Sequence, residues 1–80
     1  MVLPLSQIQV GERVKVVWVA SERHVADRLA SLGFVPKEEI SCVLGAGRGG
    51  MRAYRVRGAV IALREENIGE IFVQVNPSAD

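Results

Sequence analysis

Residues 43–64 read VLGAGRGGMRAYRVRGAVIALR, and this stretch decides between two folds for the chain. Gly45, Gly47 and Gly50 have the G-x-G-x-x-G spacing and follow an apolar, strand-like run at 40–44. In a dinucleotide-binding unit, such a loop closes backbone N–H groups on a pyrophosphate at the start of a helix. The alternative is a glycine loop between two strands, so the conformation of the residues after the loop settles the choice.

The residues after the loop favour a β-hairpin. A crossover helix must bury one face, but Arg57 lies four residues after Ala53 and three after Tyr54, where an apolar residue is needed. The 80-residue chain also has no room for the further βα units that such a sheet requires. As a strand, YRVR alternates apolar and basic side chains, and residues 60–64 return antiparallel after a tight turn at Gly58. We therefore predict a hairpin and no bound nucleotide.

The flanking runs predict a small, mainly β protein. Including the hairpin, we expect about five short strands, at residues 13–20, 40–44, 51–57, 60–64 and 70–75. In the first strand, Val14, Val16 and Trp18 alternate with Arg13, Lys15 and Val17, so we expect one buried face early in the strand and two apolar faces later. A sheet of this size avoids exposed edges by curling into a small barrel.

One short helix is expected between the first two strands. Val25, Leu29 and Leu32 recur at the i, i+4 and i+7 spacing of one apolar helix face. We expect Ser21 to cap the start of this helix. Gly33 is expected to end it in a left-handed conformation.

Length and composition set further limits. The 80 residues, 49% of them apolar, are expected to form one domain over residues 1–80, with residues 76–80 as a frayed tail. Residues 65–69 are expected to form a polar connector with Ile68 pointing inward. No apolar run approaches the roughly 20 residues needed to span a bilayer, and no basic segment precedes the first apolar residues as in a signal peptide. We therefore expect a cytoplasmic protein.

Charge is nearly balanced overall but uneven along the chain. The formal net charge is +1, yet residues 40–64 carry five arginines and no acidic residue. These arginines are Arg48, Arg52, Arg55, Arg57 and Arg64. They could face a nucleic acid or form the solvated face of strands. Only Tyr54 lies among them, whereas single-strand binding usually adds several stacking aromatic residues. Nucleic acid is therefore the less favoured partner.

The sequence offers no constellation for catalysis or metal binding. A metal site needs three or four ligands, but the chain has one histidine, His24, and one cysteine, Cys42. Cys42 lies in an apolar run and is expected in the core, whereas His24 is expected to be solvated. Glu65 and Glu66 are adjacent and would point apart on an extended segment. By elimination we expect a binding or regulatory module without a cofactor, and not an enzyme.

Two longer motifs, in order and at the right separation, resemble one family. Residues 28–36, RLASLGFVP, match the pattern R-L-x-x-L-G-[FLM]-x-P, and residues 56–64, VRGAVIALR, match V-R-G-x-x-[IL]-A-L-R. Both patterns are typical of the ferrous iron transport protein A (FeoA) family, which the chain resembles from Leu3 to Val75. The chain departs from the family at Lys37, where a glycine is usual.

The resemblance implies an SH3-like β-barrel with a short α-helical insert. It implies a non-catalytic accessory role in ferrous iron uptake, carried out by binding the membrane transporter FeoB at its cytoplasmic GTPase domain or its membrane core. The chain would then reach the inner face of the membrane through this partner. The resemblance does not imply that the chain itself carries iron, a nucleotide or another cofactor.

The matched motifs supply the candidate partner-binding residues, which are Arg28, Leu29, Leu32, Gly33, Phe34, Pro36, Arg57 and Arg64. Leu29 and Leu32 also suit the core, and Phe34 either plugs the barrel end or stands exposed as an anchor. Arg28 and Arg64 suit a partner surface better, because a long cationic side chain can lie along apolar surface. Arginine is also enriched at interface hot spots.

Other hypotheses stay open beside this one. The same barrel occurs, by resemblance, in iron-dependent repressors of the DtxR type, so the chain could be a module of iron-dependent transcriptional regulation or a nucleic-acid-associated protein. It lacks the helix-turn-helix that such a repressor needs. An enzyme built on the glycine loop is a third hypothesis. A second copy could also pair with an open strand edge beside Val17 and Val19, which would make a homo-oligomer.

Overall fold

The computed structural model describes residues 1–45 and 50–75 of the chain. Over these residues the chain forms one six-stranded sheet, antiparallel throughout, with the strand order β1-β6-β2-β3-β4-β5. The strands are β1 (Val2–Pro4), β2 (Arg13–Val19), β3 (Glu39–Leu44), β4 (Met51–Val56), β5 (Ala59–Arg64) and β6 (Ile71–Val75). The helices are the 3₁₀ turn η1 (Leu5–Gln7), α1 (Arg23–Ser31) and the single turn α2 (Glu65–Ile68). The mainly β class predicted from the sequence is confirmed.

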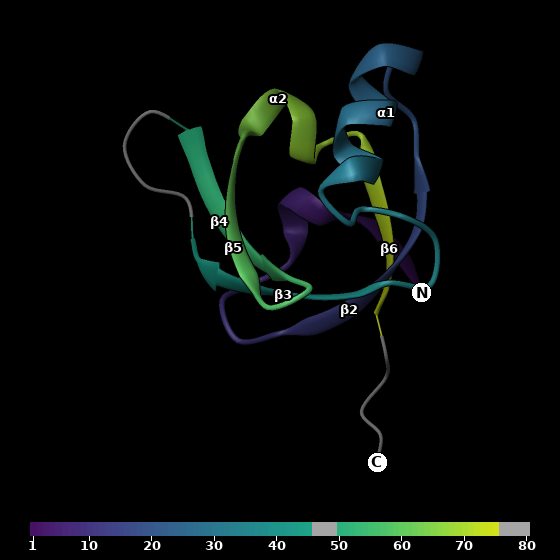
Figure 1. Ribbon diagram of the computed structural model, residues 1–80. Coiled ribbons are helices and arrows are strands. Elements are labelled where there is room, and N and C mark those ends of the chain that lie inside the picture. The colour runs from purple at the N-terminus through teal and green to yellow at the C-terminus, as the bar shows by residue number, and fades with distance from the viewer. Residues whose placement is uncertain (46–49, 76–80) are drawn as a thin grey trace.

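The sheet curls around its own inner face. The β4–β5 hairpin stands opposite β2 and β6, and α1 and α2 lie at one end of the curled sheet (Figure 1). The turn η1 connects β1 to the interior, where Leu5 is fully buried. Two side chains of β4 hold this segment: the Arg52 guanidinium donates a hydrogen bond to the Ile8 carbonyl at 2.8 Å, and the Tyr54 hydroxyl donates one to the Leu5 carbonyl at 3.5 Å.

The stretch that decides the fold is a hairpin, as predicted. Val56 pairs with Ala59, so the connecting loop has two residues, Arg57 and Gly58. Their φ angles are 52° and 81°, and a type I′ turn requires positive φ at both positions because its twist matches that of the strands. Residues 51–57 are therefore not the helix that a dinucleotide site needs. Of the glycine loop itself, residues 46–49 lie outside the described part of the chain, as does the expected tail at 76–80.

One buried cluster fills the curl, with contributions from every strand except β1. Its members are Leu5, Ile8, Val14, Val16, Leu29, Phe34, Ile40, Cys42, Tyr54, Val56, Leu63, Ile68, Ile71 and Val73. Each fully buried aliphatic side chain contributes about 1.5–3 kcal/mol relative to an exposed one. The predictions that Cys42 and Ile68 point inward are confirmed, and the expected connector at 65–69 is the turn α2.

The alternation of the first strand holds for the buried Val14 and Val16 but breaks down before Trp18. The pairing register between β2 and β6 shifts between Val16 and Trp18, so an extra residue interrupts the alternation of β2. Trp18 is consequently 60% exposed and stacks on Phe72, with ring centroids 5.6 Å apart. Simple alternation cannot reveal this shift, because a β-bulge reverses the face of every later residue.

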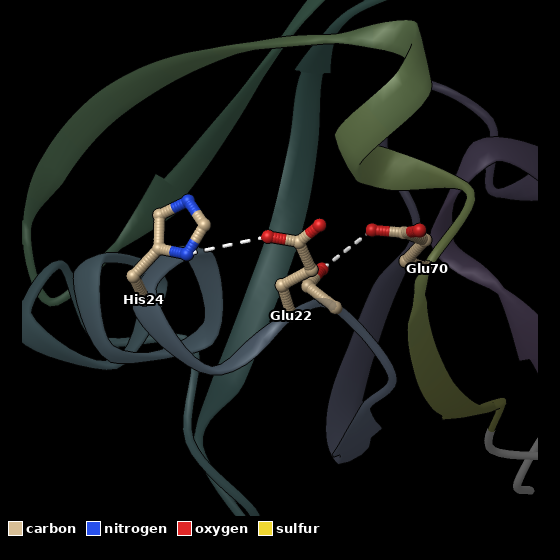
Figure 2. Close-up of polar contacts among 4 residues, drawn as sticks. Glu22, His24 and Glu70 are labelled. Atoms are coloured by element: carbon tan, nitrogen blue, oxygen red, sulfur yellow. Dashed lines mark hydrogen bonds and ion pairs between the residues drawn. The ribbon is translucent and has the colours of Figure 1, made fainter.

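The start of α1 also differs from the prediction. Its N-cap residue is Glu22 rather than Ser21, and no side chain caps the first turn. The Ser21 hydroxyl instead donates a hydrogen bond of 2.7 Å to the Glu70 carboxylate, which ties the start of α1 to the start of β6. Glu22 pairs with the exposed imidazole of His24 at 3.3 Å (Figure 2). His24 is solvated, as expected.

Two further details of the backbone were not expected. β1 forms the edge of the sheet and pairs with β6, with Pro4 opposite Phe72, which is an edge position where a proline is tolerated. Lys37 has φ of 77°, so it adopts the left-handed conformation although a glycine is usual at this position in the family it resembles. Its N–H donates a hydrogen bond of 2.8 Å to the Val16 carbonyl. This bond retains the turn despite a strain of about 1–2 kcal/mol.

Gly33 and Gly58 provide a matched pair of substitutions. Both have positive φ, but a Cβ added at Gly33 would lie 2.5 Å from Val56 Cγ1, whereas one at Gly58 would meet nothing within 4 Å. We expect Gly58→Ala to lose about 1 kcal/mol through backbone strain alone. Gly33→Ala should lose a further ~1–3 kcal/mol through overpacking. Urea unfolding of both variants measures the difference, and equal losses would contradict the role of the Gly33–Val56 contact.

Tyr54 should make the stability of the protein sensitive to alkaline pH. Burial raises the pKa of Tyr54 above its ordinary value of 10.0, although the neighbouring Arg52 works in the opposite direction. Because the folded pKa is the higher one, the contribution of the neutral phenol is complete below about pH 10 and is lost as the pH rises through the folded pKa. The free energy of unfolding from pH 8 to pH 11 should therefore fall more steeply for the native chain than for Tyr54→Phe. Parallel profiles would contradict this.

Candidate partner-binding groove

A groove lies between α1, the β4–β5 hairpin and α2. Its volume is about 330 Å³, and its lining residues are Val25, Arg28, Leu29, Leu32, Met51, Ala62, Leu63, Arg64 and Asn67. The residues lie on α1, β4, β5 and α2, apart from Leu32, which directly follows α1. The helices α1 and α2 lie at the same end of the curled sheet (Figure 1). We refer to these nine residues as the α1–β5 groove.

The floor of the α1–β5 groove is continuous with the core. Leu29 and Leu63 belong to the buried cluster, and Val25 and Leu32 are half-buried and pack against it. The apolar helix face formed by Val25, Leu29 and Leu32 therefore contributes both to the core and to the lining of the groove. An apolar side chain placed on this floor would meet the side chains of leucine and valine residues.

Two arginines flank this apolar floor. Arg28 comes from α1 and Arg64 from the end of β5, and both are exposed. The ion pairs of the described residues are Arg13–Glu39, His24–Glu22 and Arg57–Glu38, so neither groove arginine has a carboxylate partner there. No aspartate or glutamate lines the groove. The groove therefore carries two positive charges that form no ion pair with a described residue.

The other predicted site residues lie elsewhere. Phe34 is 1% exposed and plugs the core, so it is not an exposed anchor. Gly33 packs against Val56 and Arg57, and the Arg57 Nε–H donates to Glu38 Oε1 at 3.2 Å. Pro36 is exposed on a separate surface beside Lys15 and Val17. The structure thus brings together Arg28, Leu29, Leu32 and Arg64, and whether any of the eight residues binds a partner stays a prediction.

Five of the nine lining residues were not among the candidates predicted from the sequence. One of the five, Met51, can be inferred once the position of the hairpin turn is known. A two-residue turn at Arg57 and Gly58 requires Met51 to lie opposite Arg64, which is the observed pairing. The hairpin predicted from the sequence placed its turn at Gly58 and its neighbours and did not fix this register, so the exact position of the turn is the signal that would have identified Met51. Asn67 could not be inferred, because its position depends on how α2 folds back beside α1.

Of the five arginines that cluster in the sequence, two make internal contacts. Arg52 donates to the Ile8 carbonyl, and Arg57 donates to Glu38. Arg48 lies outside the described residues. The arginines of this set that carry no such contact within the described part of the chain are Arg55 and Arg64. This distribution weakens the case for a continuous nucleic-acid-binding face.

Among the described residues, no group of three histidine, cysteine, aspartate or glutamate side chains could hold a metal ion. Cys42 is buried, and its thiol faces the Leu44 carbonyl at 3.6 Å. Neither α1 nor α2, the α-helices of the described residues, is long and apolar enough to cross a bilayer. That the chain binds no metal and has no catalytic activity stays a prediction.

The single antiparallel sheet, curled around one buried cluster, defines a small, mainly β barrel domain. The family model of the FeoA domain matches residues 3–75, and the chain belongs to the FeoA family. This is the same span over which the two sequence motifs suggested the resemblance. Membership of this family of small accessory domains associates the chain with ferrous iron uptake.

Solved structures agree with this assignment. The crystal structure of an iron uptake regulatory protein (FeoA) is 26% identical, with a TM-score of 0.83, over 92% of this chain and 97% of that one. The solution structure of the FeoA protein from Chlorobium tepidum is also 26% identical, with a TM-score of 0.87, over 98% of this chain and 74% of that one. The predicted SH3-like fold is therefore confirmed. None of the curated proteins compared with the chain matches it.

A more distant likeness bears on the alternative function. A manganese-dependent transcriptional repressor has a TM-score of 0.84 over 94% of this chain, but it is 16% identical and the match covers 42% of its own length. This likeness shows a shared fold only. The hypothesis of a transcriptional regulator is therefore not favoured over a role in ferrous iron uptake.

The groove rim and the groove floor should differ in their effect on stability. Arg28→Ala and Arg64→Ala should change the free energy of unfolding by less than about 0.5 kcal/mol, because both side chains are exposed and form no internal ion pair. Leu29→Ala should cost about 2–5 kcal/mol, because Leu29 is 2% exposed in the core. Urea unfolding of the three variants measures these free energies. A large loss of stability on changing either arginine would show that the side chain stabilises the fold, which would contradict a role in partner binding alone.

Proposed function

We propose that this chain is an accessory protein of ferrous iron uptake that binds an FeoB-type transporter through the transporter's cytoplasmic GTPase domain. It acts in the cytoplasm, at the inner face of the membrane while bound, and performs no chemistry of its own. Membership of the FeoA family supports the association with iron uptake. The α1–β5 groove supports a binding role, because it gathers four of the eight candidate partner-binding residues on one surface.

The observation that carries the proposal is the pair of arginines without internal partners beside an apolar floor. Stable interfaces place a few anchors, often arginine or aromatic residues, at a desolvated centre surrounded by less important contacts. Arg28 and Arg64 have the chemistry of such anchors, and Leu32 and Val25 supply the adjoining apolar surface. A groove of this kind would form the centre of a larger contact, since stable interfaces bury about 800 Å² on each partner.

Regulation would follow from a difference in affinity between two nucleotide states of the GTPase domain. A ligand shifts a two-state equilibrium only by the amount by which it binds one state better. A tenfold preference corresponds to about 1.4 kcal/mol, and complete switching from 1:99 to 99:1 needs about 10⁴-fold. The proposed role therefore requires a measurable difference between the GDP-bound and GTP-bound domains.

The test is a titration of the intact chain with the GTPase domain of the transporter from the same organism. Amide shifts should concentrate on residues 28–36 and 62–64 and should be larger with either GDP or a GTP analogue. The double variant Arg28→Ala/Arg64→Ala should weaken binding at least about tenfold, as expected for hydrogen bonds to charged groups. Arg55→Ala is the matched control, because Arg55 is exposed on β4 but does not line the groove.

Other outcomes of the titration would each contradict a defined part of the proposal. Absence of shifts in both nucleotide states would exclude direct binding to the GTPase domain and direct attention to the membrane core of the transporter. Equal affinities in the two states would exclude state-selective regulation. Steeply salt-dependent binding to an oligonucleotide, lost on changing Arg55 and Arg64, would favour the nucleic-acid hypothesis instead.

A further inference from the structure

We propose that the α1–β5 groove binds an extended peptide segment of the partner in which acidic residues flank a large apolar residue. The segment adds to the free edge of β5, buries its apolar side chain on the groove floor and directs its carboxylates at Arg28 and Arg64. The identity of the partner rests on the proposed function. The chemistry of the segment rests on the groove alone.

The first argument is the free edge of β5. This strand is the last in the sheet order and pairs with β4 alone. No further backbone hydrogen bond to residues 59–64 occurs within the described part of the chain. Its outer edge therefore presents backbone N–H and C=O groups, and three of its residues, Ala62, Leu63 and Arg64, line the groove. An exposed edge of this kind accepts an extended peptide as an additional strand.

The second argument is the size and chemistry of the groove floor. At about 330 Å³ the groove is near the lower end of the range of ligand pockets, about 300–1,000 Å³, so it accepts one or two side chains rather than a folded surface. Leu29 and Leu63 close the floor, and no charged atom of the floor would oppose an apolar side chain. A leucine, isoleucine, methionine or phenylalanine is thus the expected anchor of the segment.

The third argument is charge complementarity. The groove holds two guanidinium groups and no carboxylate, and neither arginine is paired within the described residues. Arginine forms bidentate, charge-assisted hydrogen bonds with carboxylates, which are about twice as strong as neutral ones. A basic segment would be repelled, and a neutral one would leave both guanidinium groups without a partner. Asn67 adds an amide that can donate to or accept from the peptide backbone.

The same features disfavour two other occupants. A bilayer surface would reach the arginines at the rim but would not fill the groove between α1 and β5. Single-stranded nucleic acid binds by stacking its bases on aromatic side chains. None of the nine lining residues is aromatic. A peptide uses the backbone edge, the floor and the two cations together.

The experiment selects random peptides displayed on phage against the intact, immobilised chain, and then measures the affinity of the enriched peptides in solution. We expect enriched sequences to share aspartate or glutamate on either side of a large apolar residue. Replacing the acidic residues of the peptide by their amides should weaken binding about tenfold or more, as should Arg28→Ala/Arg64→Ala in the chain. Arg28→Lys/Arg64→Lys should restore part of the loss, and Arg55→Ala should have no effect. Peptide amide shifts should map to β5 and α1.

Several results would overturn the inference. These are the absence of any enriched peptide, enrichment of sequences without acidic residues, and binding that persists in Arg28→Ala/Arg64→Ala. Sedimentation of the chain with phosphatidylglycerol vesicles but not phosphatidylcholine vesicles, lost in the same variant, would assign the arginines to a lipid surface. Peptide binding without binding to the GTPase domain would contradict the proposed partner only. Groove shifts with the GTPase domain but no acidic–apolar peptide would contradict this inference only.

Discussion

The close approach of the end of α1 to the β4–β5 hairpin determines where the two walls of the groove lie. Gly33 has φ of 112°, and the position of its missing Cβ is only 2.5 Å from Val56 Cγ1. Any larger residue would push α1 away from the hairpin, because both sides of this contact are packed. Val56 immediately precedes the two-residue turn that sets the register of β5. The contact with Gly33 therefore also places α1 relative to the residues of β5. The groove is the space left between two elements that meet at this point.

Much of the fold could be predicted from the sequence, because its main decisions depend on local patterns. The alternation before Gly58 excluded a crossover helix, and the spacing of Val25, Leu29 and Leu32 predicted α1. The failures have a common physical origin in pairing between distant segments. The bulge that turns Trp18 outward arises from the register with β6, and Ser21 bonds to Glu70 rather than to its own helix. No window of the sequence contains both partners of these contacts.

The candidate site could be predicted in part for the same reason. The motif residues of α1 and β5 are visible in the sequence, and the tight turn fixes Met51 opposite Arg64. The sequence does not show which arginines make internal hydrogen bonds, because this depends on which carbonyl or carboxylate acceptors lie nearby in the fold. Arg52 is bound to the Ile8 carbonyl and Arg57 to Glu38, whereas Arg28 and Arg64 have no such partner among the described residues. Charge counted along the sequence overstated the basic surface.

Similarity of fold alone does not identify what this surface binds. Structures 26% identical to this chain superimpose with TM-scores of 0.83 and 0.87, and a repressor that is 16% identical reaches 0.84. The backbone is thus nearly insensitive to the changes that separate accessory proteins from regulators, and Lys37 retains a glycine-type conformation within it. Specificity must then come from side chains that the fold does not need. In this chain Arg28 and Arg64 are two such residues, because they are exposed and bound to no described carboxylate, so a functional difference between relatives should be sought first where these arginines meet the free edge of β5.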